Sequence, residues 1–173
     1  MKSKLTLMAL AAGLLAGCAT KPSSSNPTDS LAIKEARNKA IVLASEKAFT
    51  NKDAAGSLKD MAPGFITYSS RDDKPLSNID TLTKKSNEFF HAFPDWKAEN
   101  LKAVAFGDTV LVLATWSGTF KNDFPGMKAN GKSVKYDDVE IFVLNNEGKI
   151  ISQRNTQSSL IMGLQLGFFV PAK

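Results

Sequence analysis

The chain has 173 residues, of which 43% are hydrophobic, and a formal net charge of +5. This length suits one ordinary domain with a core of useful size. The single cysteine excludes an intramolecular disulfide framework and a cysteine-based metal site. The charges are scattered, with no basic stripe interleaved with aromatic residues, and this pattern argues against nucleic-acid binding.

The first 17 residues have the pattern of a bacterial export signal. Lys2 and Lys4 give a positive start, and residues 5–15 form an apolar run that is too short to span a bilayer as a helix. The run ends in the letters LAGC, where small residues precede Cys18. This ending resembles the lipobox of bacterial lipoproteins, so we expect Cys18 to be the first mature residue and to carry the lipid. A chance cysteine at the end of a plain secretory signal is the alternative.

Residues 18–30 are rich in Ser and Pro and have no apolar period, which is typical of a flexible tether. We therefore expect a signal peptide at 1–17, a lipidated cysteine and tether at 18–30, and one exported domain at 31–173. Removing Lys2 and Lys4 from the 22 basic residues leaves 20 against 17 acidic residues, a net charge of +3. Ala19 is not the Asp that often marks inner-membrane retention of lipoproteins. This favours lipid anchoring to the outer membrane, with the domain facing the periplasm or the exterior.

Helical patterns fill the first half of the domain. Apolar residues recur at helical spacing over residues 30–50 and predict a first helix. Its expected inward side consists of Ile33, Ala36, Ala40, Ile41, Leu43, Ala44 and Ala48. A short second helix is expected over 54–61 with Asp53 as its cap, followed by a short strand over 65–70. A third helix is expected over 78–93, with Pro94 beyond its end. Its inward residues are expected to be Ile79, Leu82, Phe89, Phe90 and Phe93.

Strand patterns dominate after Pro94. Residues 96–106 and 109–120 flank Gly107-Asp108, and residues 132–144 and 148–157 flank the letters NNEG, so two hairpins are predicted. A turn-rich connection over 121–131 joins them. Helices followed by a meander of antiparallel strands indicate an α+β fold, with helices packed against one face of a curved sheet.

The letters QRNTQSS at 153–159 form a polar run that continues the last predicted strand. Alternation places Gln153, Asn155 and Gln157 on the same face as Ile151, which we expect to point inward. Because buried amides must be hydrogen-bonded, these residues predict a polar patch inside a cavity. The alternative is a twisted edge strand that is solvated on both faces.

Several short motifs recur in the order and spacing of a known family. They are FPDW at 93–96, GD at 107–108, GTF at 118–120, PG at 125–126, NGKSV at 130–134, GKI at 148–150 and LQLG at 164–167. The chain resembles the SnoaL-like polyketide cyclases, or ester cyclases, of the nuclear-transport-factor-2-like superfamily, with a looser match over 48–70. The resemblance implies a cystatin-like α+β barrel: a cone-shaped antiparallel sheet around about three N-terminal helices, open at one end on an apolar cavity.

The chain departs from this family at the expected catalytic positions. The family's frequent His and Asp after GKI fall on Gln153 and Asn155, and a second frequent Asp falls on Ser158. An amide does not titrate near neutral pH, so it cannot replace a carboxylate that moves a proton. Gln153 and Asn155 can still orient a carbonyl or hydroxyl group through hydrogen bonds.

Two other titratable residues are candidates for catalysis. Glu140 shares a strand face with Tyr136, Asp138 and Phe142, and burial in the cone would raise its pKa. The alternative places Glu140 on the solvated face, because Val139, Ile141 and Val143 make a better core face. His91, the only histidine, is expected at the rim of the cone or as an ordinary surface residue.

Four aromatic residues complete the candidate ligand-binding set: Tyr68, as a hydrogen-bond donor, and Trp116, Phe65 and Phe93, as apolar walls. For each of them the alternative is packing in the core. No nucleophile-and-base arrangement, metal cluster or phosphate loop is visible, so we expect neither a metal nor a cofactor.

Our leading interpretation is a lipid-anchored domain that binds a small, largely apolar molecule in its cone without the family's acid–base chemistry. The first alternative is a cyclase or isomerase-like enzyme with a relocated acid, Glu140. The second is a non-catalytic assembly module, because sheets of this superfamily often pair face to face as homodimers.

Replacing Cys18 by Ala tests the predicted lipidation. Several acyl chains anchor a protein far better than one, so loss of the acceptor thiol should move the protein out of the membrane fraction or leave it unprocessed. Membrane fractionation and intact mass measure this outcome. Unchanged fractionation and an unchanged mass would contradict the prediction.

Overall fold

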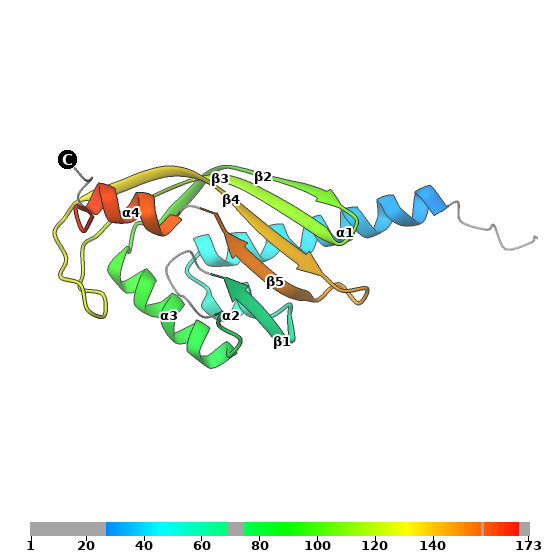
Figure 1. The fold of residues 1–173 in the computed structure, drawn as a ribbon, viewed down its shortest axis with the longest axis horizontal. Coiled ribbons are helices and arrows are strands. Elements are labelled where there is room, and N and C mark those ends of the chain that lie inside the picture. Colours follow the sequence, from blue (N-terminus) through cyan, green and yellow to red (C-terminus); the bar gives the residue numbers. More distant parts are fainter. Residues whose placement is uncertain (1–26, 69–74, 157, 170–173) are drawn as a thin grey trace, which may run out of the picture.

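The computed structural model describes residues 27–68, 75–156 and 158–169 (Figure 1). In chain order the elements are α1 (Pro27–Thr50), α2 (Ala54–Leu58), β1 (Met61–Tyr68), α3 (Ile79–Ala92), β2 (Lys97–Phe106), β3 (Thr109–Thr119), β4 (Ser133–Leu144), β5 (Ile150–Asn155) and α4 (Ser158–Leu166). The expected signal peptide, Cys18 and the tether up to residue 26 lie outside the described residues. None of the described helices is both long and apolar enough to cross a membrane.

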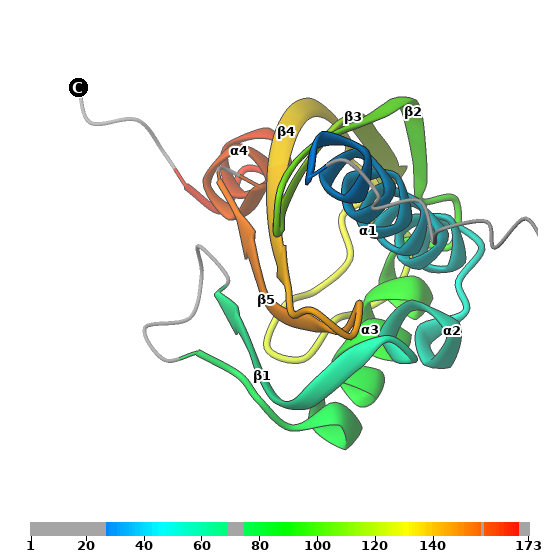
Figure 2. The ribbon, with the colours of Figure 1, turned by 90° about the vertical axis from the view of Figure 1, so that its right-hand side faces the viewer.

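The five strands form one curved sheet in the order β1-β5-β4-β3-β2, and it curls around α1, α2 and α3 (Figure 2). This arrangement confirms the predicted α+β fold. The sheet is mixed rather than wholly antiparallel, because β1 pairs with β5 in parallel. Parallel neighbours need a long connection, and here the chain passes through α3 and three strands before it returns beside β1.

Local signals set most of the element boundaries. Asp53 caps α2, its carboxylate accepting the backbone N–H of Gly56 at 2.8 Å, and Asn78 caps α3 in the same way through Thr81. The predicted hairpins form at residues 107–108 and 145–148. Gly107 has a φ of +60°, a conformation that glycine adopts without strain. Several boundaries differ from the prediction: α1 begins at Pro27 rather than residue 30, α2 ends at Leu58 rather than residue 61, and β1 begins at Met61 rather than residue 65.

The first half of α1 is bound to the turn between β2 and β3. Asn38 is fully buried, and its Nδ2 donates to the carbonyl oxygen of Gly107 at 3.0 Å. The backbone N–H of Gly107 donates to Oε1 of Glu35 at 2.8 Å. Arg37 also donates to the carbonyl oxygen of Asn146, in the turn between β4 and β5, at 3.0 Å. These bonds hold α1 against both turns at one end of the curved sheet, which we call the narrow end of the cone.

The predicted inward face of α1 was wrong in part. Ile33 is 69% exposed, and Ala36, Ala40 and Ala44 are also exposed. The buried positions are Asn38, Val42, Ser45 and Glu46, which lie on one side of the helix. Three of these four residues are polar, because they face a turn or a cavity rather than a dry core, and hydrophobic periodicity therefore missed them.

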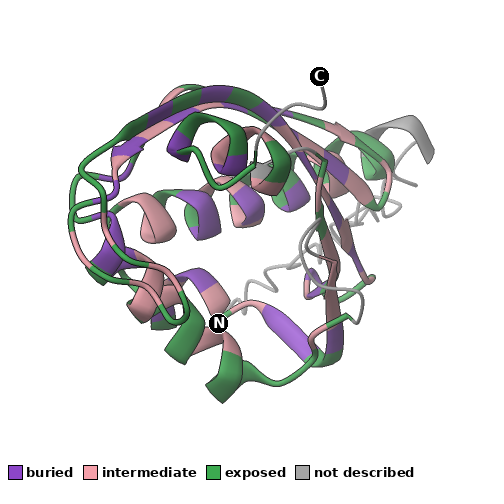
Figure 3. Cartoon of the chain, turned by 60° about the vertical axis from the view of Figure 1, so that its left-hand side comes forward, coloured by how far each residue is buried: buried purple, intermediate pink, exposed green. Residues whose placement is uncertain are grey.

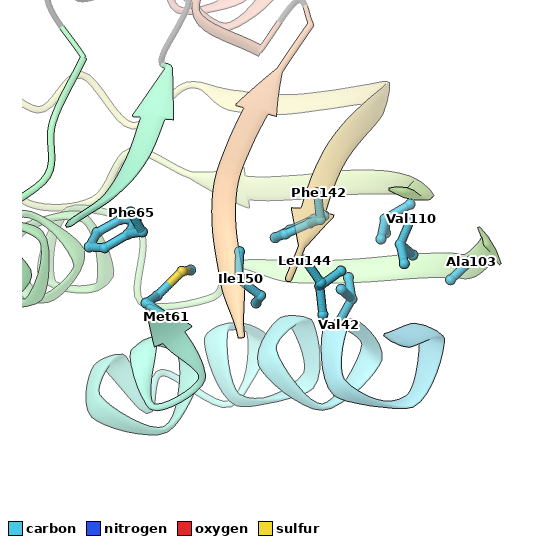
Figure 4. Close-up of a cluster of buried hydrophobic side chains, with 9 residues drawn as sticks. Val42, Met61, Phe65, Ala103, Val110, Phe142, Leu144 and Ile150 are labelled. Carbon is cyan, nitrogen blue, oxygen red and sulfur yellow. The ribbon is translucent and has the colours of Figure 1, made fainter. Parts of the chain in front are cut away.

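Two clusters of buried side chains fill the space between sheet and helices, and buried positions recur on the sides of the elements that face the interior (Figure 3). The narrow end holds an aliphatic cluster over α1 (Figure 4), consisting of Val42, Met61, Phe65, Ala103, Val110, Val112, Phe142, Leu144 and Ile150. The wide end holds a mostly aromatic cluster, consisting of Ala92, Phe93, Trp96, Ala114, Trp116, Phe120, Val134, Tyr136 and Leu166.

The helix α4 was not predicted. Gln165 fastens it to β4, because its Oε1 accepts the backbone N–H of Lys135 at 2.7 Å and its Nε2 donates to the carbonyl oxygen of Lys135 at 2.9 Å. Asn130 adds a hydrogen bond to the carbonyl oxygen of Leu166 at 2.9 Å. The helix packs on the wide end of the cone, where Leu166 joins the aromatic cluster.

Candidate functional site

A cavity of about 750 Å³ lies between the concave face of the sheet and the helices α1, α3 and α4. Most of its wall is apolar. Its polar residues include two acids, Glu46 and Glu140, and two amides, Gln153 and Asn155. The sequence had predicted three of these four residues as inward-facing candidates; Glu46 was missed.

Glu140 lies on the concave side of β4 and is only 6% exposed. Val134, Tyr136, Asp138, Phe142 and Leu144 are buried on the same face. The expectation that Val139, Ile141 and Val143 form the core face was wrong, since these residues are only half-buried on the opposite side. Both faces of β4 carry large apolar residues, so alternation alone could not identify the inner one.

A β-bulge at Ile151 directs Gln153 and Asn155 inward. The β4–β5 ladder pairs Leu144 with Ile150 but Val143 with Ser152, so Ile151 is an extra residue on β5. Ile150 is fully buried, whereas Ile151 is 39% exposed. The prediction that Ile151 points inward was therefore wrong. The bulge restores the inward direction at Gln153, which pairs with Phe142, and at Asn155, which pairs with Glu140.

Gln153 and Glu140 are joined directly, since Nε2 of Gln153 donates to Oε2 of Glu140 at 2.8 Å. This bond fixes the orientation of the carboxyl group. Next along β4, Asp138 accepts hydrogen bonds at Oδ1 from the hydroxyl of Thr156 and from the backbone N–H of Val139. Asp138 is buried but does not line the cavity.

Glu46 reaches the cavity from the opposite wall. It is 4% exposed and follows Asn38 by two turns on the same side of α1. Sequence reasoning missed Glu46 because an acid within an apolar helical pattern is usually solvated. The available signal was its spacing from Val42 and Phe49, four residues before it and three after it.

Burial and repulsion between acids disfavour negative charge in the cavity. Burial raises the pKa of Glu140 to about 7, with the hydrogen bond from Gln153 opposing the shift and repulsion from Asp138 adding to it. Burial and then repulsion from Glu140 raise the pKa of Glu46 well above its ordinary value. Burial, with repulsion from Asp138 and Glu140, also raises the pKa of the Tyr136 hydroxyl. Near neutral pH the site can therefore hold, release or accept a proton.

Aromatic rings form the wide half of the wall. Trp96 and Trp116 stack with ring centroids 5.8 Å apart, and Phe93 meets Trp96 edge-on at 5.7 Å. The structure thus places Trp116 and Phe93, two of the predicted wall residues, in the cavity lining. Gly118 makes room for Trp96, because a Cβ atom there would lie 2.7 Å from Cε3 of the indole.

Three predicted site residues do not line the cavity. Phe65 is buried in the aliphatic cluster at the narrow end. Tyr68 pairs with Arg154 across β1 and β5, and the guanidinium lies 4.4 Å from the centre of its ring, outside the cavity. His91 is exposed on α3, directly before the buried Ala92, so it faces away from the interior.

Within residues 27–68, 75–156 and 158–169, no three His, Cys, Asp or Glu side chains lie close enough together to hold a metal ion. The polar groups of the cavity are instead carboxyls, amides and hydroxyls, which donate and accept hydrogen bonds. The arrangement can orient a polar group of a small molecule and can exchange a proton with it.

Residues 39–166 match the model of a protein family described as SnoaL-like polyketide cyclase. Among solved structures, AclR from Streptomyces galilaeus, assigned provisionally as a hydroxylase, is 26% identical with a TM-score of 0.66, covering 79% of this chain and 99% of that chain. A protein from Jannaschia sp. CCS1, assigned provisionally as a SnoaL-like polyketide cyclase, is 23% identical with a TM-score of 0.65, covering 80% of this chain and 96% of that chain.

A cystatin-fold protein from Novosphingobium aromaticivorans has a TM-score of 0.55 at 16% identity and covers 69% of this chain and 97% of that chain. At such low identity the likeness shows the fold alone. No curated protein matches the chain significantly.

The raised pKa values predict a pH dependence of stability. Both acids have higher pKa values in the folded chain than the ordinary value of 4.5, so the stability they contribute is complete below pH 4.5 and is lost as the pH rises through the folded values. One pKa unit is worth about 1.4 kcal/mol, so the shift of Glu140 alone predicts a loss of roughly 3 kcal/mol.

Urea denaturation between pH 5 and pH 8 measures this loss. The carboxyls with lowered pKa values, such as Asp60 and Asp95, titrate below that window. Glu140→Gln keeps the shape and the bond to Gln153 but removes the charge, so the fall in unfolding free energy should shrink. The exposed Glu147→Gln should retain the full fall. An undiminished fall in Glu140→Gln would show that Glu140 is not the titrating group.

Proposed function

The chain belongs to the SnoaL-like polyketide cyclase family, and on that basis we propose that its cone binds a small, largely apolar molecule. The observation that carries this proposal is the cavity of about 750 Å³, which is within the usual size of ligand sites. Apolar walls with a few convergent polar groups also suit such a ligand. Gln153 and Asn155 are the groups that would orient it.

Binding of the neutral dye Nile red tests this proposal through its fluorescence. Ser86 is half-buried on α3 and lines the cavity, so Ser86→Phe should fill part of the binding volume. We expect an affinity loss of about tenfold or more, equivalent to at least about 1.4 kcal/mol. Asn87→Phe places the same ring on the next, exposed position and should bind as the wild type does. Equal binding by all three proteins would locate the dye outside the cone.

Proton transfer by Glu140 is the second candidate function. It is favoured by one specific observation, a buried carboxyl with a pKa of about 7 held by Gln153 inside the cavity. A general base works best when its pKa lies near the working pH. The ionised carboxylate would take a proton from a carbon next to a carbonyl group, and the C–H electron pair would move into the enolate. Asn155, opposite Glu140 in the ladder, would donate a hydrogen bond to the carbonyl oxygen.

The chromogenic probe 5-nitrobenzisoxazole, whose ring opens when a base removes one C–H proton, tests this chemistry. The rate should rise with pH through a midpoint of about 7, because only the ionised carboxylate of Glu140 is a base. Glu140→Gln should lose about 100-fold in rate, the lower end of what general-base catalysis contributes, and Glu147→Gln should lose nothing. A wild-type rate in Glu140→Gln would eliminate Glu140 as the base.

We also propose that the domain works in the cell envelope, attached through a lipid on Cys18. The apolar run that ends in LAGC supports this location. A ligand met there would come from the membrane, the periplasm or the exterior rather than from the cytoplasmic pool.

A further inference from the structure

We propose that the ligand of the cone carries a positive charge, and that the cavity takes a small organic cation, an amine or a quaternary ammonium group on an apolar body. This inference rests on the proposed binding function and specifies the chemical class of the ligand. It follows from three features of the described cavity wall: it contains two acids, it contains no Lys, Arg or His, and much of it is aromatic.

The acids Glu46 and Glu140 line one cavity from two elements, α1 and β4, and both are more than nine-tenths buried. Glu140 accepts a hydrogen bond from Gln153. Glu46 has no hydrogen-bond or ion-pair partner among the residues that the structure describes, although it lines the cavity. A buried polar group without a partner is costly, and a donor supplied by a ligand would remove that cost.

The described part of the cavity wall offers no positive charge. None of the described residues that line the cavity is Lys, Arg or His. On the same face of β4, the next charged residue is a third acid, Asp138. A smaller second pocket beside Phe89 is lined by one residue of each charge, Lys85 and Glu88. Among the described residues, then, none supplies the charge that would balance an ionised Glu46 or Glu140, and a cationic ligand would supply it.

The wall suits a cation as well. Ten aromatic residues of the described chain line the same cavity, among them Phe49, Trp96, Trp116 and Tyr136. The faces of such rings attract ammonium groups, Trp most strongly, and the attraction grows when the cation is desolvated. Phe49 follows Glu46 by three residues on α1, so a carboxyl and a ring project from one side of this helix.

The empty and occupied sites differ by a proton. Without a ligand, burial raises the pKa values of both acids, with repulsion from Asp138 adding to the shift of Glu140 and repulsion from Glu140 adding to that of Glu46, so both acids keep their protons to a higher pH than an exposed carboxyl does. A bound cation favours the ionised acids, and the proton leaves as the cation enters. Affinity for a cation should therefore rise with pH as Glu140 ionises, whereas affinity for a neutral ligand should not.

A matched pair of ligands tests the proposal on the full chain: 2-(1-naphthyl)ethylamine, a cation between pH 6 and pH 8, and 2-(1-naphthyl)ethanol, its neutral counterpart. Calorimetry at pH 8 should show the amine binding about tenfold more tightly, a difference of about 1.4 kcal/mol. This preference should shrink at pH 6. The double substitution Glu46→Gln with Glu140→Gln should bring the ratio of the two affinities close to one, and Glu147→Gln should preserve it.

Three results would overturn the assignment. Alcohol binding as tight as amine binding at pH 8 would refute a cationic ligand and leave the proposed binding function intact. An amine preference that survives the double substitution would locate the cation away from the two acids. Failure of both compounds to bind, together with failure of Nile red, would refute the proposed binding function and the cation with it.

Discussion

The rotation of α1 about its axis is the constraint on which the rest of the site depends, and the buried amide of Asn38 sets it. The hydrogen bond from Asn38 to Gly107 joins the helix to the turn between β2 and β3. An amide buried there cannot be turned away without losing its partner. Eight residues later, about 12 Å along the helix axis, the same side of α1 carries Glu46. The anchoring bond at the narrow end of the cone therefore directs a carboxyl into the cavity near the wide end.

Stability and function depend on different ends of the cone. The narrow end is mostly aliphatic, and Val42, Leu144 and Ile150 are almost fully buried there. The wide end is aromatic and surrounds the cavity, and its two acids make folding less favourable when they ionise. An apolar site that retains charged groups at an energetic cost is common where a protein binds or transforms a ligand. The aliphatic cluster supplies the stability that offsets this cost.

Local signals made much of the fold predictable. Caps such as Asp53 and Asn78 and the turn at Gly107 act through neighbouring residues, and strand alternation found two of the hairpins. The concave face of β4 was not predictable from alternation, because its two faces are about equally apolar. The parallel pairing of β1 with β5 depends on long-range topology that no local pattern contains.

The cavity residues were predicted less well, for physical reasons that differ from case to case. Gln153 and Asn155 were expected to face inward, but through an argument from Ile151 that the bulge contradicts. Glu46 was missed because its polarity suggests solvent, whereas a cavity wall accepts polar residues. Phe65 and Tyr68 lie on one strand near the cone, and only the tertiary structure shows that neither reaches the cavity.

The bulge at Ile151 also determines which later side chains of β5 face into the cone. If Ile151 were absorbed into the β4–β5 ladder, every later side chain of β5 would change face. Ser152 and Arg154 would then point toward Glu140, and the amides would point to solvent. A single inserted or deleted residue would thus bring a positive charge into the cavity without any substitution. Proteins of this fold can therefore change their cavity residues without a point mutation at the site. Equivalent positions on β5 can be compared between two such proteins only after the bulges in each strand have been located.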